Sequence, residues 1–216
     1  MSEFVLHGVP ASPYTHAAAL GLEEKGAHYR IAAMAPHEEK LPAYLKRHPF
    51  GRVPLLVHGD FELYETQAIL RYVDRIVSGP ALTPRDAKAE ARMNQICGIT
   101  DWYVMPHISI GISFDRLVAP MLGLPVDEAK ITASIPRAAT CIDEVARLLG
   151  DRPFVTGESL SLADLLLAPH LVFFARTPES VAILGPHRAL RTWIERMATR
   201  PSFQATMPET LAANAA

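Results

Sequence analysis

Short apolar runs flank an Ala- and Leu-rich helical segment at the start of the chain. Residues 4–6 and 29–32 are compact apolar runs that predict buried strands. The segment between them, residues 13–25, carries helix start and stop signals: Ser12 at the N-cap, Pro13 at the first helical position and Gly26 past the end. We therefore expect a β-α-β unit with parallel strands and a right-handed crossover.

A second set of elements follows a polar stretch, residues 34–48, where we expect a loop with a short helix. Residues 55–57 and 61–63 flank Gly59-Asp60, a turn typical of an antiparallel hairpin. Residues 65–77 then place apolar side chains on one face of a helix. The order β-α-β followed by β-β-α is that of a thioredoxin-like domain, which we expect over residues 1–78.

Helical periodicity dominates the rest of the chain. Gly and Pro mark residues 79–86 as a linker, and no alternating strand pattern follows. Ser161 and Asp164 form a capping box, which is a folding signal and carries no chemistry. Helices are expected at residues 85–118 (bent near Pro106), 127–149, 162–176 and 188–199. The predicted fold is thus an α/β thioredoxin-like N-terminal domain plus an all-α C-terminal helical bundle over residues 87–216.

Composition excludes several classes of function. A net charge of -2 over 216 residues gives no basic footprint for nucleic acid or an anionic membrane. The cysteines, Cys97 and Cys141, are far apart, and the histidines form no pair at ligand spacing, so neither a disulfide framework nor a metal site is expected. Because no signal peptide and no membrane-spanning apolar run are visible, we expect the protein in the cytoplasm.

The first polar motif lies at the start of the first helix. The Ser12 hydroxyl is placed beside unpaired backbone N–H groups and the positive end of the helix dipole. An ordinary N-cap serine would sit in the same place. However, Ser12-Pro13-Tyr14-Thr15 fills the position in which thiol oxidoreductases carry Cys-Pro-Tyr-Cys. The chain cannot exchange a dithiol there, but a hydroxyl can donate a hydrogen bond to the sulfur of a ligand.

Two further motifs are suited to the rest of a thiol peptide. If the Val53-Pro54 bond is cis, the Val53 backbone is available to pair with an extended peptide, although most X-Pro bonds are trans. Glu65 and Thr66 open a helix, where they are either a plain dipole complement and cap or contacts for the ammonium and carboxylate of an α-amino acid. Lys40 is either solvated or a contact for a distal carboxylate.

These motifs resemble the glutathione transferase family over nearly the full length of the chain. The resemblance rests on residues 12–15, 41–54, 63–69 and 161–164, and it is closest to the serine-type classes, phi and theta, and their bacterial relatives. It implies an enzyme of detoxification that conjugates the thiolate of glutathione to small hydrophobic electrophiles, with glutathione as co-substrate and no metal.

The resemblance also implies a role for each site residue. Ser12 would activate the thiol, and Val53, before Pro54, would pair with the cysteinyl backbone. Glu65 and Thr66 would hold the γ-glutamyl end, and Lys40 and Arg52 would serve the glycyl carboxylate. Three residues depart from the family pattern: His48 stands for a common Asn, Thr66 for a common Ser and His16 for a basic residue.

A homodimer is a further implication, in which Phe50 inserts into the partner subunit. The electrophile is expected between the two domains, against the first long helix. Its pocket is expected to be lined by apolar and aromatic residues: Pro10, Trp102, Tyr103, Met105, His107, Ile108 and Phe114.

Two alternatives to conjugation stay open. The same site suits a glutathione-dependent isomerase, dehalogenase or peroxidase. The fold also suits a non-catalytic binding or assembly module, because fold does not fix function. The intact set of polar residues counts against the second alternative.

Overall fold

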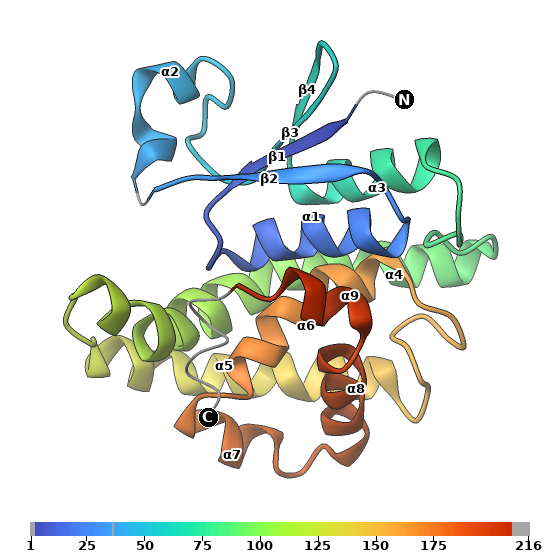
Figure 1. The fold of residues 1–216 in the computed structure, drawn as a ribbon. Helices are drawn as coiled ribbons and strands as arrows, with labels where there is room; N and C mark the ends of the chain where they lie inside the picture. The colour runs from blue at the N-terminus through green and yellow to red at the C-terminus, as the bar shows by residue number, and fades with distance from the viewer. Residues whose placement is uncertain (1–2, 36, 209–216) are drawn as a thin grey trace. The chain divides into compact units, whose positions relative to one another are not determined.

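The computed structural model describes residues 3–35 and 37–208 of the chain, which divides into two compact units (Figure 1). Among the described residues, the first unit comprises residues 3–35, 37–81 and 201–208, and the second comprises residues 82–200. The sequence assigned everything after residue 87 to the helical part. In the structure, helix α9 (Pro201–Thr206) instead belongs to the first unit.

A four-stranded mixed sheet forms the centre of the first unit. Its strands lie in the order β2-β1-β3-β4, with β1 parallel to β2 and antiparallel to β3, and with β3 antiparallel to β4. The bounds are β1 (Phe4–Gly8), β2 (Tyr29–Ala33), β3 (Leu55–His58) and β4 (Phe61–Tyr64). The sequence analysis is confirmed in this respect: the β-α-β and β-β-α order is that of a thioredoxin-like domain.

Helices α1 (Pro13–Glu24) and α3 (Thr66–Ile76) pack on this sheet. Their shared core is apolar and fully buried, because the strands present alternate side chains to the helices. It contains Phe4, Leu6, Ala18, Ala19, Leu22, Leu56, Ile69 and Val73. Between β2 and β3, η1 (Glu38–Lys40) and α2 (Pro42–Leu45) take the place of the expected loop with a short helix.

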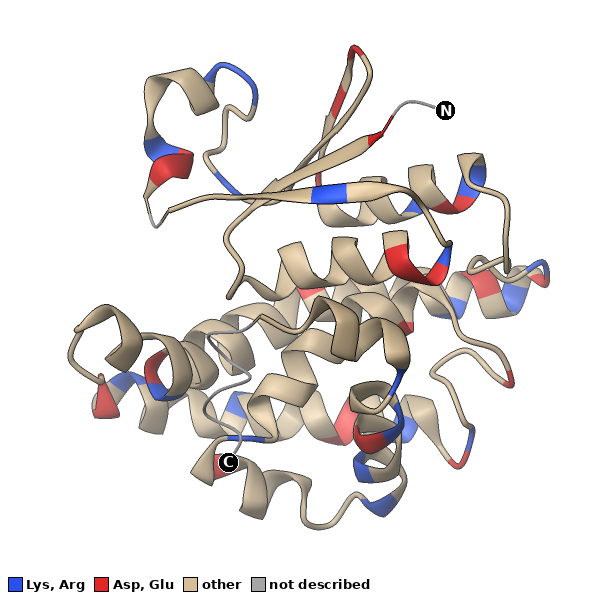
Figure 2. Cartoon of the chain, in the orientation of Figure 1, with Lys and Arg blue, Asp and Glu red and all other residues tan. Residues whose placement is uncertain are grey.

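The second unit is entirely helical apart from an isolated bridge between Phe154 and Gly157. Its helices are α4 (Ala87–Ile99), η2 (Thr100–Val118), η3 (Pro120–Leu122), α5 (Glu128–Leu149), α6 (Leu162–Phe174), α7 (Pro178–Leu184) and α8 (Arg188–Ala198). Every residue of α6 is buried, in keeping with an apolar surface on all sides. Figure 2 shows acidic and basic residues interspersed over both units.

One predicted helix differs from the structure. Residues 85–118 form α4 followed by η2, a helix of the wider i→i+5 type that contains Pro106. The wider winding is visible at its end, where the Ala119 N–H donates to the Phe114 carbonyl at 2.8 Å. Pro106 has no N–H to donate, so the regular ladder is interrupted there.

Candidate functional site

The turn between β1 and α1 places Ser12 at the N-cap of α1. The Ser12 N–H donates to the Val9 carbonyl at 3.0 Å, and its Oγ accepts from the Thr15 N–H at 3.4 Å. The turn is tight, because a Cβ at Gly8 would lie only 2.4 Å from the Thr15 hydroxyl. The long Ser12–Thr15 bond uses a lone pair of Oγ, so the hydroxyl proton can be donated to a ligand.

The Val53-Pro54 bond is cis, which answers the question that the sequence left open. Val53 and Val9 both pack against a buried cluster of Met34, Tyr44 and Leu55. The residue before the cis bond therefore belongs to the same cluster as the segment that leads into the Ser12 turn.

Strand register aligns these features at one edge of the sheet. His7 pairs with Leu55, and Leu55 pairs with Tyr64 on the next strand. The residues just past these pairs are Gly8, Pro54 and Glu65, so the end of β1, the start of β3 and the end of β4 lie in a row. The Ser12 turn, the cis bond and the start of α3 therefore meet at that edge.

Glu65 has a backbone conformation that L-residues rarely adopt. Its φ is 70° and its ψ is 111°, and its side chain makes no capping hydrogen bond to α3. A non-glycine residue in such a region costs about 1–3 kcal/mol and is found mainly at functional sites. Thr66, the first residue of α3, is buried. The Glu65 side chain therefore does not cap α3 through a hydrogen bond, and the residue is exposed.

Lys40 and Arg52 both adjoin Gly51: Lys40 reaches it through its side chain, and Arg52 follows it in the chain. The Lys40 ammonium donates to the Gly51 carbonyl at 2.5 Å, whereas the Arg52 side chain is exposed and its carbonyl accepts from the Tyr44 hydroxyl at 2.8 Å. Gly51 has a φ of 54°, and a Cβ there would lie 3.2 Å from the Lys40 Nζ. The segment between β2 and the cis bond thus carries two cations, and the Lys40 side chain reaches the residue just before Arg52.

Sequence reasoning did not foresee the surroundings of His48. Its buried ring stacks on Tyr64 with centroids 4.4 Å apart, and the ring of Phe50 lies edge-on to Tyr64 at 6.1 Å. Burial first, and then the positive charges of Lys40 and Arg52, lower the pKa of His48. The neutral ring of His48, which lies in the segment between Lys40 and Arg52, therefore contacts Tyr64, the residue before Glu65. Phe50 itself is 67% exposed.

The residues predicted to contact the electrophile fall on both units. Pro10 is exposed in the first unit. Four others are on η2: Trp102 is 77% and Tyr103 56% exposed, and His107 and Phe114 are half-buried. Of the remaining two, Ile108 is buried and Met105 half-buried on the same helix.

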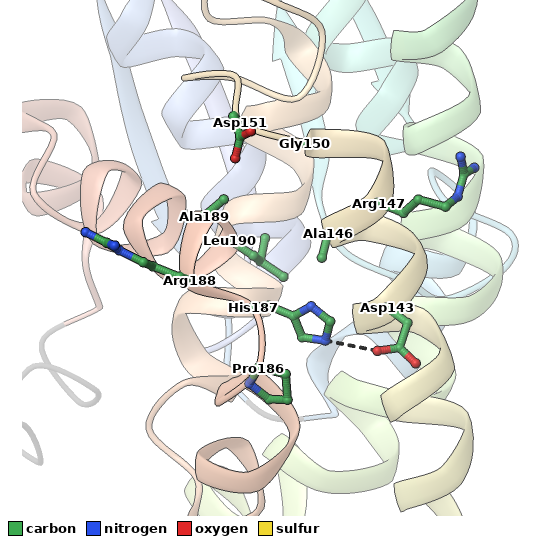
Figure 3. A pocket seen from close by; sticks show the side chains of 10 residues that line it. All are labelled: Asp143, Ala146, Arg147, Gly150, Asp151, Pro186, His187, Arg188, Ala189 and Leu190. Atoms are coloured by element: carbon green, nitrogen blue, oxygen red, sulfur yellow. Dashed lines mark hydrogen bonds and ion pairs between the residues drawn. The ribbon is translucent and has the colours of Figure 1, made fainter.

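A separate hollow of about 380 Å³ lies in the second unit, between the end of α5 and the start of α8 (Figure 3). His187 and Asp143 both line it, and the His187 Nε2 and Asp143 Oδ1 are hydrogen-bonded at 2.9 Å. The hollow contains none of the predicted site residues.

The site residues suit particular chemistry. Helix N-termini favour anions, and here the starts of α1 and α3 lie at the same sheet edge. Arg52 directly precedes the cis bond at this edge, and Lys40 is bonded to the Gly51 carbonyl. Among residues 3–35 and 37–208, no cluster of His, Cys, Asp and Glu is suited to hold a metal ion. Within the same ranges, none of the helices has the length and apolar character to cross a membrane.

Comparison with known proteins gives matches to both units. The family model for the glutathione S-transferase N-terminal domain matches residues 2–75, and that for the C-terminal domain matches residues 128–196. Glutathione S-transferase 3 of Zea mays is 32% identical over 96% of this chain and 94% of its own length.

Solved structures agree with this result. Glutathione S-transferase III in its apo form has a TM-score of 0.85 at 29% identity, covering 97% of both chains. Glutathione S-transferase I from maize, in complex with an atrazine–glutathione conjugate, has a TM-score of 0.82 at 26% identity and covers 99% of both chains.

Proposed function

This chain belongs to the glutathione S-transferase family, a family of transferases with glutathione as co-substrate, and on that premise we propose that Ser12 holds the glutathione sulfur as its thiolate for conjugation to small hydrophobic electrophiles. The observation that carries the proposal is the alignment of the Ser12 turn, the cis bond and Glu65 at one sheet edge.

Each part of the tripeptide has a proposed partner at this edge. The Val53 backbone, before the cis bond to Pro54, pairs with the cysteinyl residue. Glu65 and Thr66 bind the γ-glutamyl ammonium and carboxylate at the start of α3. Lys40 and Arg52 neutralise the glycyl carboxylate, and Lys40 is already held close to Gly51.

The serine-type, phi-like assignment rests on the end of β1. The tyrosine-type classes place their catalytic Tyr at this position, where the chain has His7 followed by Gly8. A Cβ at Gly8 would meet the Thr15 side chain at 2.4 Å, so this position has no room for a larger residue. Ser12 instead offers a hydroxyl at this edge, at the start of α1.

The size of the expected effect follows from acid–base chemistry. A free thiol with a pKa of about 8.5 is only about 3% ionised at neutral pH. Lowering that pKa by about 2 units corresponds to about 2.7 kcal/mol and makes the thiolate predominant. The gain in thiolate is therefore capped at about 30-fold and is partly offset by weaker nucleophilicity. Any larger acceleration comes from positioning the electrophile.

Quaternary structure and location extend the proposal. We propose a cytoplasmic homodimer in which the exposed Phe50 inserts into the partner subunit, and a boundary between the two functional domains within residues 79–86. The aromatic and apolar residues Trp102, Tyr103, His107 and Phe114, with Pro10, are the proposed contacts of the electrophile.

The pH dependence of conjugation tests the role of Ser12. In Ser12→Ala, kcat/KM should fall at neutral pH and recover as pH rises past the pKa of the free thiol, while glutathione affinity stays within a few-fold. Thr66→Ala is the matched binding variant and should weaken glutathione binding in calorimetry. An unchanged pH profile in Ser12→Ala would refute the assignment.

A panel of substrates separates conjugation from the other uses of the site. Halogenated, peroxide and isomerisable compounds would each report a different glutathione-dependent reaction. Retention on immobilised glutathione without turnover of any of them would indicate a binding module instead.

A further inference from the structure

Helix α9, close to the C-terminus, packs against α1 (Figure 1). The Ser202 hydroxyl donates to the Glu24 carboxylate at the last turn of α1. At the other end, the His16 Nε2 and the Thr206 Oγ1 are 2.9 Å apart. His16 and Thr206 are separated by 190 positions in the sequence, so this contact belongs to the tertiary fold.

The direction of the His16–Thr206 bond follows from the remaining bonds of the hydroxyl. Thr206 Oγ1 donates its proton to the Ser202 carbonyl at 2.8 Å, so it accepts from the imidazole Nε2–H. His16 is only 2% exposed, and its ring lies against Phe203 with centroids 4.5 Å apart. Burial lowers the pKa of His16 to about 4, so the ring is neutral at neutral pH.

His16 also takes part in the first turn of α1. Its backbone N–H donates to the Ser12 carbonyl at 3.0 Å, which closes the turn that carries the candidate hydroxyl. His16 is therefore hydrogen-bonded to Ser12 through its backbone and to α9 through its ring. The Ser202–Glu24 contact lies two turns further along α1 and has no such connection to Ser12.

We propose that α9 acts as a clasp on α1, in which Thr206 and His16 are positioning residues that fix the direction of the Ser12 hydroxyl. This inference rests on the proposed function of Ser12. Neither residue touches the sulfur. Their effect comes through the geometry of the first turn, and a hydroxyl moved by even a few tenths of an ångström donates a weaker hydrogen bond to a thiolate.

Matched variants at the two ends of α9 test the clasp. Thr206→Val keeps the shape of the side chain but removes the hydroxyl that contacts the His16 ring, whereas Ser202→Ala removes the hydroxyl that contacts Glu24. Thr206→Ser restores the hydroxyl and serves as the rescue. The readouts are the ultraviolet absorbance of the thiolate in the glutathione complex across pH, the steady-state constants and amide hydrogen exchange along α1.

The clasp predicts different outcomes for the two ends. Thr206→Val should raise the pKa of the bound thiol by about half a unit to one unit, which lowers kcat about 1.5- to threefold at neutral pH with KM for glutathione changed less than about twofold. The amides of Thr15 and His16 should exchange faster. Ser202→Ala should leave the thiol pKa and these amides unchanged, and Thr206→Ser should resemble the unmodified protein.

A purely structural role gives another result. If Thr206→Val and Ser202→Ala lower the melting temperature alike and neither moves the thiol pKa or the exchange of the first turn, the clasp is overturned. Ser12→Ala separates the two proposals. If Ser12→Ala leaves the thiol pKa unchanged, the proposed role of Ser12 is wrong. Amide hydrogen exchange then tests the clasp by itself: Thr206→Val should speed exchange at His16 and Ser202→Ala should not, and equal exchange in the two variants would overturn the clasp.

Discussion

At the residue scale, one buried carboxylate connects three segments of the second unit. Asp164 accepts hydrogen bonds from the Val155 N–H at 2.9 Å, from the Ser161 N–H and hydroxyl at 2.9 and 2.7 Å, and from the Trp193 indole N–H at 2.9 Å. The sequence predicted the capping box with Ser161. It did not predict the contacts with Val155 and Trp193, which depend on the packing of α6 against α8.

Removing that carboxylate should destabilise the protein strongly. Asp164→Ala leaves several buried donors without an acceptor, each costing about 1–3 kcal/mol, so we expect a loss of about 3 kcal/mol or more in the free energy of unfolding. Urea denaturation measures it, with Asp151→Ala, an exposed acid of the same unit, as the control. A loss below about 1 kcal/mol would contradict the importance of this network.

Replacing Glu65 with glycine is expected to raise stability and to weaken glutathione binding. Because its φ is 70°, Glu65→Gly should relieve backbone strain and raise the free energy of unfolding by about 1 kcal/mol, while glutathione affinity falls with the loss of the carboxylate. Glu65→Ala keeps the unfavourable φ and should lose affinity without the gain. Thermal denaturation and calorimetry measure both, and equal stability of the two variants would argue against strain.

Local signals explain how much of the site the sequence could predict. Ser12, Pro13 and Gly26 mark a helix by short-range chemistry, and Val53-Pro54 and Glu65-Thr66 adjoin strands whose periodicity is clear. The partner of His16 and the ring stack of His48 could not be found this way, because both depend on residues brought together by the fold. The cis state of Val53-Pro54 was likewise beyond a single sequence.

At the element scale, η2 is a segment in which hydrophobic periodicity does not predict the winding of the helix. A 3.6-residue pattern predicts one bent helix over residues 85–118, but Pro106 interrupts the hydrogen-bond ladder and the winding widens. Close packing with α5 accompanies this geometry: a Cβ at Gly111 would lie 2.4 Å from the Ser134 Oγ and 3.1 Å from the Pro106 carbonyl oxygen. Helices α7 and α9 went unpredicted because each is seven residues or shorter.

Two glycine substitutions test this packing. Gly111→Ala should destabilise the second unit by about 1–3 kcal/mol, because α5 has to move to accept the methyl group. Gly98→Ala in α4 meets nothing within 4 Å and should stabilise the protein by up to about 1 kcal/mol through helix propensity. Denaturant midpoints compare them directly. Equal effects would show that η2 and α5 are not closely packed.

At the scale of the whole molecule, buried neutral histidines set the stability toward acid. Burial lowers the pKa of His16 to about 4 and that of His170, which bonds Ser109 at 2.7 Å, to about 3. In the unfolded chain both bind protons near pH 6.5. The unfolded state therefore binds more protons than the folded state below that pH, so stability is complete above pH 6.5 and falls as the pH drops toward 4.

This linkage predicts the slope of stability with pH. Each histidine should contribute a loss of about 1.4 kcal/mol per pH unit between pH 6.5 and about 4. His170→Gln should reduce the slope. Urea denaturation at a series of pH values provides the slopes. A slope that His170→Gln leaves unaltered would contradict the neutral buried state.

The most direct test of the central claim is a titration of the thiol itself, without any electrophile. The ultraviolet absorbance of the thiolate in the glutathione complex should rise with a pKa about 2 units below that of free glutathione, and in Ser12→Ala the pKa should return toward the free value. Identical titration curves for the unmodified protein and Ser12→Ala, with glutathione bound in both, would contradict the account.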